Sequence, residues 1–281
     1  MTLAETLFSY HPWLIAPEAH AAMVAAGRAL FESPKSPFDS GEEDELDEPP
    51  LLTVKDGVGI ISIHGPMMRN PDLLCKLLFG ATDTEEIIRA VNAAAEWPDV
   101  QAVLLDIDSP GGSVSGTPEL AQAVADLSKA KYTYAFSGGQ MCSAAYWVAS
   151  QCDAIYATPG AWIGSIGVIL PVIDSSQAYK QAGLKVEVFA AGKFKSTGTP
   201  GVSLTDEQRA WLQADVEEIA ADFHSAILVR GRKIPAEAME GQTFSTRKAM
   251  RFNLSGMVKS REEALQTLRR RHVTPSATAA R

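Results

Sequence analysis

Two patterns of apolar residues alternate along the chain. Short continuous apolar runs predict buried strands, and apolar residues that recur every three or four positions predict amphipathic helices. The predicted strands cover 58–63, 102–107, 132–136, 154–157 and 185–189, and the predicted helices lie near 84–96, 117–129, 143–151 and 175–183. Strands that alternate with helices favour an α/β fold in which helices cover a mainly parallel sheet.

The remaining segments set the domain boundaries. Pro17 predicts the start of a further helix, and Thr205 with Gln208 forms a capping box at the start of a long helix that ends near Val229. Prolines bracket an acidic run, Glu42–Glu48, which cannot bury enough apolar surface to become ordered. We therefore expect a helical N-terminal segment (1–31), an acidic Pro-rich linker (32–50), a compact domain (51–258) and a helix end with a flexible tail (259–281).

Composition excludes several classes of protein. Of the 281 residues 46% are hydrophobic, and the formal net charge of −9 argues against a general nucleic-acid binder. The three cysteines have neither metal-site spacing nor an even number, which favours a reducing compartment. The apolar runs are shorter than the ~20 residues of a membrane span, and the N-terminus has no secretory pattern. We expect a cytoplasmic protein, in a bacterium or a host cell, with no membrane anchor and no nucleic-acid partner.

The stretch Met141–Trp147 holds the first candidate for chemistry. Ser143 stands at the start of an Ala-rich apolar helix, directly after the Gly-rich turn Ser137–Gly139. A helix N-terminus offers free N–H groups and a positive dipole end to developing negative charge, so a serine there can act as a nucleophile. Most serines at helix starts are simple N-caps, and the chemical interpretation therefore depends on the rest of the chain.

Two other turns carry small residues. Asp108–Val114 runs from a strand into Pro-Gly-Gly, and adjacent glycines let backbone N–H groups approach a substrate closely, as an oxyanion hole requires. Gly164–Val168 is a second small-residue turn, and it carries the hydroxyl of Ser165. Pro-Gly-Gly is by itself most often only a tight turn, so these turns gain weight only in combination with Ser143.

The choice of a general base separates the possible mechanisms. A Ser-His-Asp site needs an imidazole, but none of the five histidines falls between His64, at a predicted strand end, and His224, inside a long helix. Lysine can take this role when burial favours its neutral form. Lys193 and Lys195 lie close together in the fourth small-residue segment, and chemistry alone does not choose between them.

Taken in order, four motifs resemble the signal peptide peptidase A family of Ser/Lys proteases, which includes a bacteriophage prohead protease. The resemblance runs from about Val58 to Val258. It implies the fold shared by the Clp proteolytic subunit and the crotonases, a spiral of ββα units. The motifs are Asp108–Gly112, Met141–Tyr146, Gly164–Gly167 and Gly192–Ser196.

The resemblance also implies a role for each matching residue. Ser143 would be the acylating nucleophile and Lys195 the general base, with Ser165 orienting the lysine amine. The backbone N–H groups of Gly112 and Ala144 would form the oxyanion hole. Activity that rises towards alkaline pH is expected, because the base must lose its proton.

Further expectations concern substrates and assembly. Gly111 and Ser113 would contact the substrate, no metal or other cofactor is implied, and the subunits would form a homo-oligomeric ring in which serine and lysine can come from adjacent copies. The segment His11–Pro17 is similar to the leader of phage-type members, which favours capsid, portal or scaffold proteins as substrates and places the protein in the procapsid or the cytoplasm. Three alternatives stay open: a bacterial peptidase that degrades peptides, a crotonase-like acyl-CoA enzyme and a non-catalytic shell component.

Overall fold

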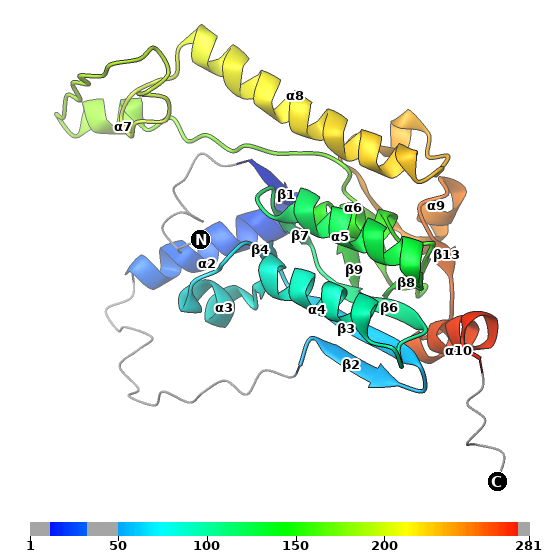
Figure 1. The fold of residues 1–281 in the computed structure, drawn as a ribbon. Helices are drawn as coiled ribbons and strands as arrows, with labels where there is room; N and C mark the ends of the chain where they lie inside the picture. Colours follow the sequence, from blue (N-terminus) through cyan, green and yellow to red (C-terminus); the bar gives the residue numbers. More distant parts are fainter. Residues whose placement is uncertain (1–11, 33–49, 275–281) are drawn as a thin grey trace, which may run out of the picture.

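The computed structural model describes residues 12–32 and 50–274 and has the predicted α/β architecture (Figure 1). The helices are α2 (Pro17–Glu32), α3 (Leu73–Phe79), α4 (Thr84–Glu96), α5 (Thr117–Ala130), α6 (Ala144–Ser150), α7 (Ser176–Gln181), α8 (Asp206–Val229), the short η1 (Ala236–Ala238), α9 (Thr246–Arg251) and α10 (Arg261–His272). The strands are β1 (Trp13–Ile15), β2 (Leu52–Lys55), β3 (Val58–His64), β4 (Met67–Met68), β5 (Thr82–Asp83), β6 (Ala102–Asp108), β7 (Gly111–Ser113), β8 (Tyr132–Ser137), β9 (Gln140–Cys142), β10 (Ala154–Ala157), β11 (Trp162–Gly164), β12 (Thr243–Ser245) and β13 (Gly256–Met257).

A strand–strand–helix unit recurs along the chain. β3 and β4 precede α4, β6 and β7 precede α5, and β8 and β9 precede α6. The first strands of these units join the six-stranded sheet, in the order β13-β10-β8-β6-β3-β2, while the second strands enter two smaller sheets. This is the series of ββα units that the family resemblance implied.

The six-stranded sheet is buried on both faces. Alternate residues of β6 point in opposite directions, so Val103 and Leu105 join the cluster that contains α4 and α5, whereas Leu104 joins a cluster with Leu265 and Leu268 of α10. Burial on both faces explains why these strands are continuous apolar runs in the sequence. All its strand pairs are parallel except that of β2 with β3.

Helix α6 lies in the interior, with every residue buried. The ring of Trp147 stacks on Phe223 of α8, with 4.8 Å between ring centroids, and the Tyr146 hydroxyl donates a hydrogen bond to Leu254 O (3.0 Å). The predicted capping box at Thr205 and Gln208 is present at the start of α8. The contacts of Trp147 and Tyr146 hold in place the helix that follows Ser143.

Residues 173–204, which include α7, form an arm that Figure 1 shows standing away from the sheets. Helix α7 confirms the helix predicted near 175–183, but the predicted strand 185–189 is wrong. That segment pairs with no strand in the described part of the chain, and Phe189 is 93% exposed. The alternating apolar residues of 185–189 have the pattern of a strand, but within the described chain they have no core to pack against.

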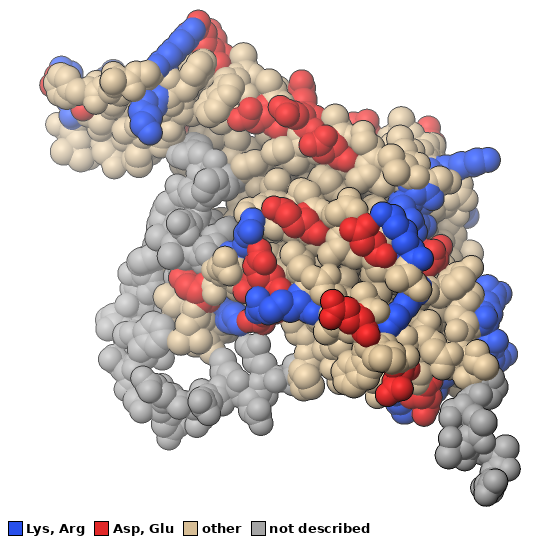
Figure 2. All heavy atoms as spheres, in the orientation of Figure 1, with Lys and Arg blue, Asp and Glu red and all other residues tan. Residues whose placement is uncertain are grey.

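Acidic and basic side chains are interspersed over the face drawn in Figure 2, with acidic residues along α8. Among the described helices, none is long and apolar enough to cross a membrane. Residues 33–49 of the predicted linker and 275–281 of the predicted tail lie outside the described residues, so the predicted domain boundaries stay predictions.

Candidate active site

Ser143 lies at a sharp turn between β9 and α6. Its φ of 52° and ψ of −118° belong to a region that residues other than glycine rarely adopt, at a cost on the order of 1–3 kcal/mol. The Ser143 hydroxyl does not cap the helix, so the simple N-cap interpretation does not hold. The hydroxyl donates a hydrogen bond to Gly167 O instead (3.4 Å). The strained turn therefore keeps the hydroxyl away from the helix backbone.

Ser165 lies beside Ser143. β9 and β11 are parallel and pair Cys142 with Gly164, so the two serines follow directly at the ends of neighbouring strands. Ser143 N–H donates to Gly164 O (2.8 Å), and Ser165 N–H donates to Gln242 O (2.7 Å). Ser165 also has a positive φ, of 51°. The sheet thus brings together two hydroxyl turns that are distant in the sequence.

The Pro-Gly-Gly turn packs against the same strand. Ser109 N–H donates to Gln140 O (2.8 Å), and Cys142 N–H donates to Ser109 O (3.1 Å). A Cβ at Gly111 would stand only 2.9 Å from Ser143 Cβ, and the φ of Gly111 is 106°. Glycine is therefore required where the turn approaches the serine.

The two residues predicted to supply backbone N–H groups each adjoin a residue of the Ser143 turn: Gly112 follows Gly111, and Ala144 follows Ser143. Gly112 lies in β7, where a Cβ would stand 1.8 Å from Met67 O, so its backbone can come this close only without a side chain. Ala144 is the first residue of α6, and the first N–H groups of a helix have no partner within it. Of the residues predicted for the site, Gly111 packs against Ser143, and Ser165 follows Gly164, the strand partner of Cys142. Gly112 and Ser113 continue β7 from Gly111.

The two candidate lysines lie on the arm. Lys193 Nζ is 2.6 Å from Glu207 Oε1, in an exposed ion pair. Lys195 is exposed, and within the described chain its ammonium has no hydrogen bond or ion pair, with Ser143 or any other residue. The single chain therefore holds the serine and the two small-residue turns in one place and the lysine in another.

The chain offers a cysteine and two histidines as alternative nucleophile or base, and the structure supports none of them. Burial raises the pKa of the Cys142 thiol to about 12, so the thiolate that could compete with Ser143 is not formed near neutral pH. His64 is exposed at the end of β3, and His224 Nε2 lies 3.1 Å from Met239 O. Neither imidazole hydrogen-bonds to Ser143 in the described chain.

The sequence interpretation missed strand β1. It pairs antiparallel with β7, with Leu14 opposite Gly112. Next to Cys142 is a pocket whose walls come from Gln140 and Trp162 and from the start of α2. Three bulky apolar residues between Pro12 and Ala16 were the available signal, but a three-residue strand is too short to identify without its partner.

Comparison with known proteins gives the family. Residues 125–273, just over half of the chain, match the model of peptidase family S49. The chain is 29% identical over 178 residues to the capsid assembly protease C of Escherichia phage lambda, covering 63% of this chain and 40% of that protein. It is 28% identical over 167 residues to the head-tail preconnector protein GP5 of Enterobacteria phage P21, covering 59% of this chain and 33% of that one.

The chain spans only part of the length of these relatives. The matched region covers 61% of a protein from Methanocaldococcus jannaschii, to which the chain is 30% identical. An enoyl-CoA hydratase structure from Thermoplasma volcanium is 13% identical, with a TM-score of 0.44 over 82% of this chain and 81% of that one. A likeness this weak adds nothing to the assignment. The matched residues include Ser143, Ser165 and both candidate lysines. Because the family model matches more than half of the chain, the chain belongs to peptidase family S49.

Proposed function

We propose that this protein is a serine endopeptidase in which Ser143 is the nucleophile and Lys195 the general base. The observation that carries the proposal is the strained turn that holds Ser143 against the Pro-Gly-Gly turn and at the start of α6. A positive φ at a buried serine is costly, and such strain is concentrated at functional sites.

In this mechanism Ser143 Oγ attacks the carbonyl carbon of the scissile peptide bond while Lys195 Nζ takes the hydroxyl proton. The carbonyl oxygen becomes an oxyanion, which the N–H groups of Gly112 and Ala144 stabilise. The lysine then gives its proton to the leaving amine, and the C–N bond breaks. Water hydrolyses the resulting ester on Ser143, with the lysine again accepting and returning the proton.

The lysine that serves Ser143 comes, in this proposal, from a second copy of the chain. Lys195 lies on the exposed arm, and its ammonium is unpaired in the described chain, whereas Lys193 is held by Glu207. Ile173, Leu184, Val188 and Phe189 of the same arm are exposed apolar residues. Exposed apolar patches mark protein interfaces, and packing of the arm on a neighbour would bury both these residues and the lysine. A closed ring is the symmetric assembly that such a head-to-tail contact produces.

We assign the substrates to capsid, scaffold or portal proteins of a phage head. Two relatives, from phages lambda and P21, have names that refer to capsid assembly and to a head-tail preconnector. The test is incubation of the purified protein with scaffold and portal proteins of a phage head, and separately with signal peptides. Cleavage of the head proteins alone is expected, and cleavage of signal peptides alone would contradict the assignment.

The chemistry is tested with unfolded casein and two pairs of variants. Ser143→Ala and Lys195→Ala are each expected to lower kcat at least about a thousandfold, since removal of a nucleophile or its base abolishes covalent catalysis. Lys193→Ala, two positions away on the arm, and Ser128→Ala, on α5, should cleave at the rate of the unaltered protein. Undiminished cleavage by either of the first two variants would contradict the dyad.

A further inference from the structure

Strand β1 lies between two segments of the peptidase domain. On one side it pairs antiparallel with β7, Trp13 opposite Ser113 and Ile15 opposite Gly111. On the other side Trp13 N–H donates to Ile169 O (2.7 Å), and Ile169 N–H donates to Trp13 O (3.0 Å). β1 is therefore an added strand that completes a sheet between the Pro-Gly-Gly turn and the segment that follows Ser165. Strand addition of this kind is a common way to bind an extended peptide.

The register places the Leu14 carbonyl close to Ser143. Ala16 N–H donates to Pro110 O (2.8 Å), and hydrogen-bonded pairs recur every second residue in an antiparallel ladder. Leu14 and Gly112 thus occupy a hydrogen-bonded position, where the Gly112 N–H faces the Leu14 carbonyl. The point where a Gly111 Cβ would stand is 2.1 Å from Leu14 O and 2.9 Å from Ser143 Cβ. Leu14 O and Ser143 Cβ therefore both crowd the same point beside this glycine, within 5.0 Å of each other.

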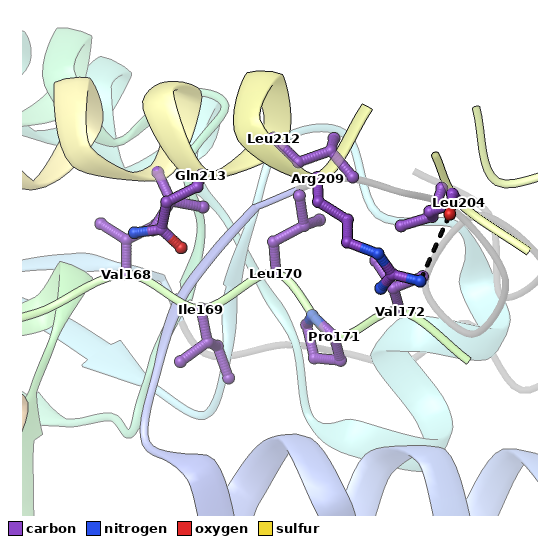
Figure 3. Close-up of a pocket in the computed structure, with 10 residues that line it drawn as sticks. Val168, Ile169, Leu170, Pro171, Val172, Leu204, Arg209, Leu212 and Gln213 are labelled. Atoms are coloured by element: carbon purple, nitrogen blue, oxygen red, sulfur yellow. Dashed lines mark hydrogen bonds between the residues drawn. The ribbon is translucent and has the colours of Figure 1, made fainter. Parts of the chain in front are cut away.

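The side chains of β1 alternate between two apolar clusters. Leu14 is fully buried in the main core, whereas Trp13 and Ile15 pack in a separate cluster with Met23 of α2 and Ile169. Figure 3 shows the partner segment: Val168 and Leu170 point towards α8, and Ile169 points to the opposite side. Both strands therefore have the alternation of a paired, extended backbone.

We propose that residues Trp13–Ala16 are an internal pseudosubstrate, an inference that rests on the proposed role of Ser143. The strand fills the groove between β7 and Ile169 in which a substrate peptide pairs, and it engages the Gly112 N–H. Ser143 has an exposed fraction of 0%, although a nucleophile must be reached by its substrate. Cleavage of another protein therefore requires β1 to leave the groove.

The same geometry protects β1 from being cut. After Leu14 the chain is held by the hydrogen bond of Ala16 N–H and by α2, whose Met23 is buried in the cluster of Trp13. An amine released at Ile15 would stay beside the acyl carbonyl, at a high effective concentration, and would re-form the peptide bond. A tethered strand also competes strongly with a free substrate peptide.

The test uses the 281-residue chain and measures by mass spectrometry the rate at which a fluorophosphonate probe phosphonylates Ser143, forming a P–O bond and releasing fluoride. Trp13→Asp places a charge in an apolar cluster, and Ala16→Pro removes one N–H of the ladder. Both are expected to react at least about tenfold faster than the unaltered chain. Ala26→Asp, on an exposed position of α2, should react at the unaltered rate. Circular dichroism checks that each variant is folded.

A second measurement does not depend on the folding of β1 variants. The peptide Pro-Trp-Leu-Ile-Ala-Pro, added to Ala16→Pro, is expected to slow phosphonylation, whereas the same peptide with Asp in place of Leu should not. Equal phosphonylation rates in the unaltered chain and both β1 variants would overturn the pseudosubstrate and leave the nucleophile in place. A chain found cut after Leu14 would also overturn it. Phosphonylation of Ser143 in none of the proteins would contradict the proposed function itself.

Discussion

At Ser143 the backbone adopts angles that a glycine would accept without strain. Ser143→Ala removes the hydroxyl but keeps the strained Cβ, whereas Ser143→Gly removes both. We expect Ser143→Gly to have an unfolding free energy about 1 kcal/mol higher than Ser143→Ala, because the alanine retains the unfavourable φ. Thermal denaturation of the two inactive variants measures the difference. Equal stabilities would show that the turn stores no strain.

Cys142 precedes Ser143 and is the residue whose chemistry could be confused with it. Burial raises the pKa of its thiol to about 12, and that of Cys152 to about 12 as well. The reactive thiolate is formed only as the pH approaches this value, so iodoacetamide at pH 8 should leave both thiols of the native protein unmodified and casein cleavage unchanged. Intact mass and residual activity check this. Loss of activity upon alkylation of Cys142 would contradict a serine nucleophile.

At the scale of single elements, the approach of β7 to β4 depends on one missing side chain. A Cβ at Gly112 would lie 1.8 Å from Met67 O, a backbone atom that cannot swing away, whereas nothing lies within 4 Å of a Cβ at Gly160. Gly112→Ala should therefore lose at least about 3 kcal/mol of unfolding free energy and its activity. Gly160→Ala, the matched control, should change stability by less than about 1 kcal/mol. Chemical denaturation measures both, and a native-like Gly112→Ala would contradict the packing of β7 described above.

Most regular elements could be predicted from the sequence because their pattern is local. The apolar run of β6 predicts a strand, and the capping box at Thr205 predicts the start of a helix, each from a few consecutive residues. β1 could not be predicted, since three residues form a strand only where β7 and Ile169 lie on either side. At Val186 and Val188 a strand was predicted that is not there: the apolar alternation lies on an exposed arm without a partner strand.

The candidate site was predictable to a similar extent. Small-residue turns and a missing histidine indicated which residues matter, but the parallel register of β9 and β11 is what puts Ser165 beside Ser143. Chemical reasoning from the sequence left Lys193 and Lys195 as equal candidates for the general base. The ion pair of Lys193 with Glu207 distinguishes them, and a sequence does not reveal a contact between residues 14 positions apart on two elements.

At the scale of the whole molecule, the serine and the lysine belong to different parts. Ser143 lies in the buried centre, between two sheets and α6, while Lys195 lies on an arm whose residues are almost all at least partly exposed. In the proposed mechanism the site is complete only when the arm of one copy reaches the centre of another. Activity is therefore expected to depend on protein concentration, because dissociated subunits would lack the base.

The most direct test of this central claim is to mix two inactive variants. Ser143→Ala supplies Lys195 and lacks the nucleophile, and Lys195→Ala supplies Ser143 and lacks the base. If the dyad forms between copies, equal amounts that are unfolded and refolded together should recover about a quarter of the unaltered casein-cleaving activity, by random assembly in the ring. Activity of the mixture no higher than that of either variant alone would contradict the account.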